Sequence, residues 1–374
     1  MTRNFTKRTG LLPFIVLFVL TPAAMAQTRP TEGAAASAEQ IVEAYLQKSG
    51  DRGFSAAVWA EGGVAWSQQW GQRDKENGHD VTPDTMFRIG SVSKMITVMT
   101  LGSMVQRGEL SLDATIDTYL PEAPANYAPL TPRLLAGHLA GVRHYASQAE
   151  FLSQKQCDEQ AAALEIFAAD PLVSKPGSEY HYSTYGYTTL GAVMERAAGK
   201  SLAELLRERI YAPSGMENTF AEHNETVEGE LAVPYVSVQG QNMISPPVNN
   251  SCKLSGGGLV STPIDLAKFL GAVCENRIVS RETLQEMLTS MHTADGEATG
   301  VGLGWRIAND DRERRYIHHG GSAAGGRCFI LLYPDAGVGV ALCMNLYTDG
   351  PTFGEDMALQ IATLFLDSED DQSP

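Results

Sequence analysis

The stretch FRIGSVSKMIT, from Phe87 to Thr97, opens a helix that is predicted to extend to Gly108. Glycine commonly ends helices, and the residues that follow Gly90 are apolar on nearly every face of this one. A helix of this kind is buried rather than amphipathic. We therefore expect it to lie inside the core of the protein.

Two serines and one lysine stand at the start of this helix. Ser91 and Lys94 are three residues apart and share a face, whereas Ser93 points about 100° away from Lys94. Ser91 also lies where free backbone N–H groups favour a developing oxyanion. Ser-x-x-Lys alone is a weak motif that usually marks a cap and a surface lysine. The apolar helix around it instead favours a desolvated Lys94 with a lowered pKa, and Ser91 as the nucleophile.

Strand patterns occur on both sides of this helix. FSAAVWAEGGVAWSQQWG, residues 54–71, predicts a hairpin that turns at Glu61-Gly62-Gly63. Late in the chain GVGLGWRIA, RYIHHGG, RCFILLYP and VGVALCMNLY predict further strands, and a final helix follows them. The intervening chain is dominated by helical patterns such as YTTLGAVMERAAGKSLAELLRERI.

This order predicts an α+β fold, in which one antiparallel sheet is built from both chain ends and flanked by helices. Residues 27–115 and 253–374 are expected to form the sheet-containing lobe, and residues 116–252 an inserted, mainly helical lobe. The site is expected in the cleft between the two lobes, with Ser91, Tyr182 and His318 converging at their boundary.

Residues 1–26 have the order of a secretory signal peptide. Basic residues precede the apolar run LLPFIVLFVL, and small residues at Ala24 and Ala26 predict a cut before Gln27. The apolar run is shorter than the roughly 20 residues that a spanning helix needs, so an uncleaved anchor is the weaker interpretation. A mitochondrial presequence shares the basic, acid-free start but does not need so compact an apolar block. We expect an exported protein, periplasmic or secreted, without a stable membrane anchor after cleavage.

The charge balance excludes one class of partner. The 374 residues carry a formal net charge of −16 at pH 7, and the predicted signal contributes basic residues only. An acidic exported protein repels phosphate backbones, so nucleic acid is not expected as a partner. A small molecule or a peptide is the expected substrate, and no cofactor is predicted.

Five cysteines are widely spaced along the chain: Cys157, Cys252, Cys274, Cys328 and Cys343. This spacing resembles neither a disulfide scaffold nor a zinc site, so small buried apolar residues are the preferred interpretation. The last two flank a predicted hairpin at PDAG. Gly337 favours a bulge in a three-residue loop, which would place Cys328 and Cys343 on opposite faces without a disulfide.

A serine nucleophile needs a proton acceptor, and PGSEYHYSTYGYTTLG offers four tyrosines, at positions 180, 182, 185 and 187. Each alone is typical of a packing residue. The histidine pairs do not favour a metal site. Neighbours on a strand point to opposite faces, so His318 and His319 cannot easily bind one ion. His138 and His144 are six residues apart, and His138 is expected to fix its loop through hydrogen bonds.

Three stretches together resemble the serine β-lactamase and penicillin-binding-protein superfamily, in its class C-like branch. FRIGSVSKMIT is similar to the first family motif, PGSEYHYSTYGYTTLGAVMER to the second and YIHHGGSAAGG to the third. GVRHY and NNSCK are most similar to the mitochondrial serine β-lactamase-like proteins, and lactamase-fold esterases belong to the same branch. The resemblance covers nearly the whole chain after residue 26 and implies the β-lactamase/DD-peptidase-like fold.

The resemblance also implies residue roles. Ser91 would attack a carbonyl, and Tyr182, made more acidic by the charge of Lys94, would take the proton and return it to the leaving group. The backbone N–H groups of Ser91 and Gly321 would form the oxyanion hole. Thr184, His318 and Gly320 would contact the substrate, with His318 in the place of the usual lysine or histidine. Water would then hydrolyse the acyl-enzyme.

Two departures from the family pattern bear on the substrate. Thr184 replaces the usual asparagine of the second motif, and His318 replaces the lysine of the third. Both weaken the recognition of an amide and a carboxylate, so an esterase or a peptidase for small or D-configured substrates is favoured over a dedicated β-lactamase. The alternatives are a dedicated β-lactamase, a D-amino-acid peptidase, or a non-catalytic binding or assembly protein on the same fold.

Overall fold

A computed structural model describes residues 1–2, 32–49, 52–222, 230–347 and 353–370. The predicted signal segment, apart from its first two residues, lies outside the described residues. Within the described ranges, no helix combines the length and the apolar composition that crossing a bilayer requires.

One six-stranded antiparallel sheet organises the molecule, with the strand order β10-β11-β12-β13-β1-β2. Its strands come from both ends of the chain: β1 Phe54–Ala60, β2 Gly63–Trp70, β10 Arg306–Asn309, β11 Arg315–Ala323, β12 Gly326–Tyr333 and β13 Val338–Met344. The predicted hairpin is confirmed, because Ala60 pairs with Gly63 across Glu61 and Gly62, both at positive φ.

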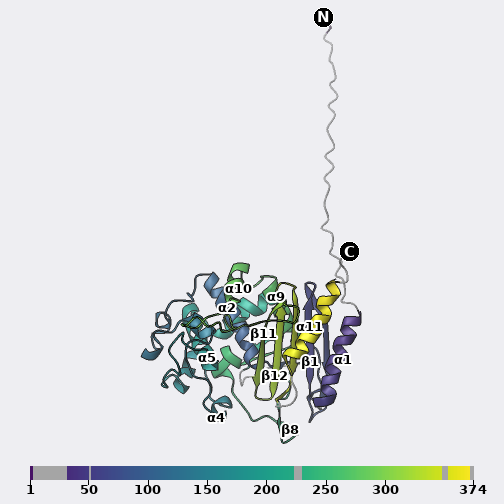
Figure 1. The fold of residues 1–374 in the computed structure, drawn as a ribbon, viewed down its shortest axis with the longest axis horizontal. Coiled ribbons are helices and arrows are strands. Elements are labelled where there is room, and N and C mark those ends of the chain that lie inside the picture. The colour runs from purple at the N-terminus through teal and green to yellow at the C-terminus, as the bar shows by residue number, and fades with distance from the viewer. Residues whose placement is uncertain (3–31, 50–51, 223–229, 348–352, 371–374) are drawn as a thin grey trace.

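Helices cover both faces of the sheet. α1 (Glu32–Ser49) and α11 (Glu355–Asp370), from opposite chain ends, pack side by side on one face (Figure 1). α9 (Pro263–Cys274) covers β1 and β13 on the other face. The core on that side also contains α2 (Ser93–Gln106), whose first twelve residues are all buried. The predicted burial of this helix is therefore confirmed.

The chain between β2 and β10 carries most of the short elements. These are β3 Gln72–Asp74, β4 His79–Asp80, β5 Phe87–Arg88, η1 Gly90–Val92, η2 Ile116–Thr118, η3 Ala125–Tyr127, α3 Pro132–Ala136, α4 Gln148–Phe151, η4 Gln160–Ile166, α5 Thr184–Ala198, α6 Leu202–Leu206, η5 Arg207–Tyr211, α7 Ala212–Ser214, β6 Phe220–Ala221, β7 Tyr235–Val238, β8 Gln241–Ile244, η6 Ser251–Lys253, α8 Leu254–Gly257, β9 Leu259–Ser261 and α10 Arg281–Met287. A last strand, β14 Leu346–Tyr347, follows β13.

The middle of the chain is less purely helical than the sequence analysis expects. β7 and β8 form a hairpin that turns at Gln239 and Gly240, both at positive φ, and β7 also pairs with β14. The sequence YVSV, followed by a Gln-Gly turn, has the residue pattern of a β-strand. The sequence analysis did not use this strand signal when it assigned the segment as helical. The lobe boundaries near residues 115 and 252 stay a prediction.

The register prediction for the β12–β13 hairpin is wrong. Cys328 lies directly opposite Cys343, because Tyr333 pairs with Val338 around a four-residue loop closed by the N–H of Gly337. That loop keeps the register that a two-residue turn would give, so both cysteines share a face. Their thiols are nevertheless free, as predicted.

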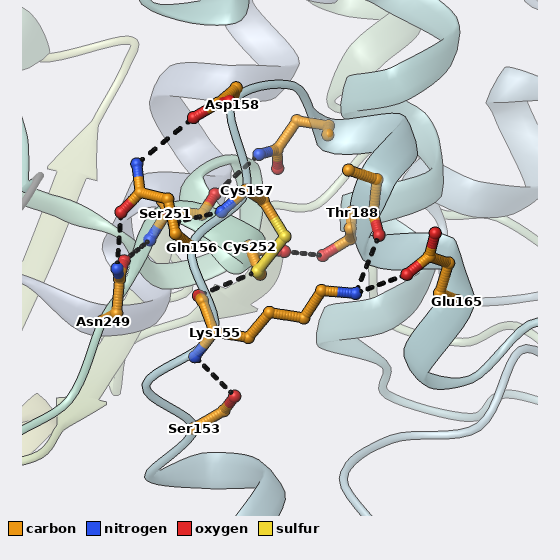
Figure 2. Close-up of a disulfide and its surroundings, with 12 residues drawn as sticks. Ser153, Lys155, Gln156, Cys157, Asp158, Glu165, Thr188, Asn249, Ser251 and Cys252 are labelled. Carbon is orange, nitrogen blue, oxygen red and sulfur yellow. Dashed lines mark hydrogen bonds and ion pairs between the residues drawn. A yellow bond between two sulfur atoms is a disulfide. The ribbon is translucent and has the colours of Figure 1, made fainter.

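A disulfide joins Cys157 to Cys252 (Figure 2). This corrects the interpretation of these two cysteines as small apolar residues. They are 95 residues apart in the sequence, so no local spacing could indicate the pair. The bridge fastens the segment before η4 to η6, and the N–H of Cys157 donates to Ser251 Oγ at 2.9 Å.

Candidate active site

Ser91 lies in η1, the short turn between β5 and α2. Gly90 before it has a φ of 50°, and a Cβ there would lie 2.5 Å from the carbonyl oxygen of Ser322 on β11. Only glycine combines this conformation with this close approach. The turn that carries Ser91 is therefore packed closely against β11 of the main sheet.

The predicted Ser-Lys-Tyr set converges. Lys94 Nζ lies 3.2 Å from Ser91 Oγ, and the Tyr182 hydroxyl donates to the same Oγ at 2.7 Å. Ser93 is excluded from this cluster, because its Oγ accepts the backbone N–H of Leu259 at 3.2 Å. The choice of Ser91 over Ser93 made from helix geometry agrees with these contacts.

Lys94 is fully buried, with 0% of its surface exposed. Besides Ser91, its Nζ contacts the carbonyl oxygen of Gly256 at 2.5 Å and Thr184 Oγ1 at 3.1 Å. The rings of Tyr182 and Tyr187 lie 4.8 and 5.3 Å away. Burial lowers the pKa of Lys94 well below its usual value.

The pKa of Tyr182 is shifted in the opposite direction to the one that the sequence analysis predicts. Burial raises the pKa of its phenol to about 12, and the hydrogen bond with Ser91 only partly opposes this. The sequence analysis expected the charge of Lys94 to make Tyr182 more acidic. Burial also lowers the pKa of Lys94 and so disfavours the charge that was expected to acidify the phenol, which stays protonated at neutral pH.

Gly256, which sequence reasoning missed, lies in α8 and is fixed by its neighbours. Ser255 Oγ donates to the carbonyl of Tyr187 at 2.8 Å, and Thr97 Oγ1 donates to the carbonyl of Ser255 at 2.8 Å. The Cys157–Cys252 disulfide anchors η6 immediately before α8. The carbonyl group of Gly256, which contacts Lys94, is therefore held in place by these hydrogen bonds and by the nearby disulfide.

Thr184 lies beside the buried lysine. Its side chain is only 2% exposed, and its hydroxyl contacts Lys94. The predicted contact of Thr184 with a substrate stays a prediction.

His318 departs from the prediction, because it faces away from the site. Its Nε2 lies 3.6 Å from Glu355 Oε1 on α11, and its ring packs near Tyr316 and Phe329. His319 points to the opposite face, and its ring lies 6.1 Å from that of Tyr182. His319 is thus the histidine on the side of Tyr182. Ile317 and Tyr316 are both buried, on opposite faces of β11, so the apolar pattern of this strand could not indicate which histidine faces the site.

The state of His319 follows from its contacts. Its Nδ1 lies 2.6 Å from the carbonyl oxygen of Gly320, which can only accept, so Nδ1 carries the hydrogen. Burial lowers the pKa of His319 to about 3. His319 is therefore neutral, with the lone pair on Nε2.

The glycines of β11 bring the strand against η1. A Cβ on Gly321 would lie 1.9 Å from the carbonyl oxygen of Ile89 and 3.1 Å from the backbone nitrogen of Val92. Gly320 is partly exposed beside them. Among the described residues, no group of three or more His, Cys, Asp or Glu side chains is arranged to hold a metal ion.

Comparisons with known proteins agree with this geometry. The Beta-lactamase family model matches residues 38–364. The human mitochondrial serine beta-lactamase-like protein LACTB is 26% identical, over 80% of this chain and 72% of its own length. Penicillin-binding protein 4* of Bacillus subtilis (strain 168) is 25% identical, over 74% of this chain and 64% of its own length.

Solved structures share the fold. The D-amino acid amidase of Ochrobactrum anthropi SV3 superposes with a TM-score of 0.77 and 23% identity, over 91% of this chain and 100% of that chain. The octameric penicillin-binding protein homologue of Pyrococcus abyssi gives a TM-score of 0.76 and 24% identity, over 89% of this chain and 77% of that chain. The resemblance and the fold class inferred from the sequence are thereby confirmed. The chain belongs to the Beta-lactamase family, within the serine β-lactamase and penicillin-binding-protein superfamily of hydrolases.

Proposed function

We propose that this protein is a serine hydrolase that cleaves ester or amide bonds through an acyl-enzyme on Ser91. The observation that supports this proposal most strongly is that the buried Lys94 Nζ contacts three oxygen atoms, those of Ser91, Thr184 and Gly256. A neutral amine has two N–H donors and one lone pair. The carbonyl of Gly256 and the hydroxyl oxygen of Thr184 can accept the two donors, which leaves the lone pair for the proton of Ser91.

The proposed reaction assigns the base to Lys94. Lys94 takes the proton of Ser91 while Oγ attacks the carbonyl carbon, and the Tyr182 hydroxyl gives its proton to the leaving group as the bond to carbon breaks. The Lys94 ammonium then returns a proton to the tyrosinate. Water attacks the resulting ester and loses its proton to Lys94, and Lys94 returns that proton to Ser91 Oγ as the bond between Oγ and the acyl carbon breaks.

The oxyanion would be held by backbone N–H groups. Ser91 offers one of them at the start of the helical segment. The second would come from Gly321, as the sequence predicts, or from Ser322 if the shift from His318 to His319 moves the motif by one residue. Neighbouring N–H groups of a strand point to opposite edges, so only one of the two can face Ser91.

The substrate we propose is a small ester or a D-configured acyl compound without a required carboxylate, because neutral His319 offers no ammonium for an anion. The D-amino acid amidase and the teichoic acid D-alanine hydrolase of Staphylococcus aureus, which is 26% identical over 67% of this chain and 62% of its own length, support small D-configured substrates. Thr184 stands where the family motif has asparagine, and this difference also favours a small ester or D-configured substrate. Its support is less direct, because the Thr184 side chain contacts Lys94.

We expect the protein to hydrolyse a short activated ester with a much higher kcat/KM than the cephalosporin nitrocefin. His319→Lys should raise kcat/KM for nitrocefin about tenfold or more, because a charged hydrogen bond to a carboxylate contributes about 1.5–3 kcal/mol. His79→Lys adds the same charge at an exposed position and is the matched control. Efficient nitrocefin hydrolysis by the native protein with negligible esterase activity would overturn the substrate assignment.

We also propose that the protein is exported. The signal-like order of residues 1–26 supports this, and so does the Cys157–Cys252 bridge, because disulfides persist in oxidising compartments. Expression of the full chain in a secreting bacterial host should yield a mature protein that begins at Gln27, as read by N-terminal sequencing. Uncleaved protein retained in the cytosol would contradict export.

A further inference from the structure

The backbone on both sides of Tyr182 is held by one histidine. The carbonyl oxygen of His138 accepts the N–H of His181 at 2.8 Å, and its imidazole Nδ1 accepts the N–H of Ser183 at 3.2 Å. The two bonds bracket Tyr182 within the chain. A single residue in the loop after α3 thus fixes the path of the segment that carries the phenol.

A second histidine makes the matching contact one residue further on. Nδ1 of His144 accepts the N–H of Thr184 at 3.2 Å. The imidazole rings also touch the phenol ring itself: that of His138 lies 4.5 Å from Tyr182 at an interplanar angle of 40°, and that of His144 lies 5.6 Å away at 84°. Tyr182 is therefore packed by one ring across its face and by another against its edge.

Both contacts require neutral imidazoles with a defined tautomer. An amide N–H can only donate, so each Nδ1 must keep its lone pair and the hydrogen must sit on Nε2. Burial lowers the pKa of His138 well below its usual value. The partly buried ring of His144, which still reaches the surface, has its pKa lowered to about 4. The acceptors are thus present at neutral pH.

His138 adopts this place at a conformational cost. It has a φ of 60°, in the left-handed region that non-glycine residues seldom occupy, and its Nε2 is buried without a hydrogen-bond partner among the described residues. Strain and an unpaired polar atom persist only where the surroundings enforce them, and such features gather at functional sites.

We propose that His138 and His144 are positioning residues that hold the Tyr182 hydroxyl at Ser91. The inference rests on the proposed acyl-enzyme function and adds two residues that the family motifs quoted above do not assign. The hydrogen bonds of Ser91 and Lys94 given above involve neither histidine, so both act through Tyr182 and its flanking backbone.

His144 gives the sharper test, because it reaches the surface and its replacement should be tolerated by the fold. His144→Leu removes the acceptor but keeps bulk, whereas His144→Asn keeps an acceptor oxygen near the position of Nδ1. We expect His144→Leu to lower the acylation rate constant for an alkyl ester about tenfold or more, because the alkoxide leaving group needs the proton of Tyr182 and a small misplacement of a reacting group is costly. His144→Asn should stay within about threefold of the native protein, with the same affinity for the ester.

The same His144 variants made in a Tyr182→Phe protein show whether His144 acts by positioning the Tyr182 hydroxyl or by stabilising the site in general. Once the hydroxyl is gone, His144→Leu and His144→Asn should acylate at the same rate, because they no longer have a proton donor to place. Acylation measured by intact mass over time remains readable in slow variants. A His144→Leu defect that persists undiminished in the Tyr182→Phe background, or its absence in the native background, would overturn the proposal. Failure of the native protein to acylate would instead refute the proposed function.

Discussion

Ser91→Ala is expected to abolish turnover, with a loss on the order of 10⁴–10⁶-fold in kcat. Among the described residues, only the Ser91 hydroxyl has both Lys94 Nζ within 3.2 Å and the phenol of Tyr182 donating to it. Removing it deletes the atom that carries the acyl group. Steady-state hydrolysis of a short activated ester measures the loss.

Ser93→Ala is the matched control, two residues away on the same segment. Its hydroxyl accepts the buried N–H of Leu259, so its loss leaves a donor unsatisfied and should cost about 1–3 kcal/mol in the free energy of unfolding. Turnover of the folded protein should change little. A Ser93→Ala protein that is stable but inactive would contradict the assignment of the nucleophile.

Lys94→Met is expected to lower kcat/KM by on the order of 10²–10⁴-fold, the usual contribution of a positioned base. Methionine is apolar and fits a fully buried position, so the loss reports the missing amine. Lys94→Arg should be similarly inactive, because a guanidinium keeps its charge and cannot accept the proton of Ser91. Substantial activity in Lys94→Arg would show that a positive charge, and not a neutral base, is required.

The lowered pKa of Lys94 also sets the expected pH dependence. Burial lowers this pKa, so the proposed neutral amine forms at a lower pH than in an ordinary lysine and is lost as the pH falls through the lowered value. The acid limb of kcat/KM should therefore lie well below the ordinary lysine pKa of about 10.4. Tyr182, with a pKa of about 12, should cause no alkaline loss near neutrality. An activity that keeps rising tenfold per pH unit up to about pH 10 would contradict a depressed lysine pKa.

Local geometry made the choice between the two serines and part of the fold predictable. The three-residue spacing of Ser91 and Lys94 on an apolar helix already selects one serine, because helical turns fix which side chains share a face. The hairpin at Glu61-Gly62 follows in the same way from a turn that favours glycine. The family motifs supplied what spacing could not, which is that Tyr182 returns to the serine from 91 residues away.

Predictions about features that depend on tertiary packing were wrong or were not made. His318 and His319 are adjacent on a strand whose two faces are both buried, so the sequence leaves open which ring lies beside Tyr182. The contacts of His318 with Glu355 and of His319 with Tyr182 resolve it. The electrostatics of Tyr182 depend on how completely Lys94 is desolvated, which no spacing records. The Cys157–Cys252 bridge depends on the approach of two distant loops.

The central claim is that Ser91 forms the acyl-enzyme, and intact-protein mass spectrometry with a fluorophosphonate probe, followed by peptide mapping, tests it most directly. We expect a single adduct on the peptide that carries Ser91 in the native protein and in Ser93→Ala, and none in Ser91→Ala. An adduct that persists in Ser91→Ala, or a folded native protein that is never labelled, would contradict the account, and the second result would favour a non-catalytic binding protein on this fold.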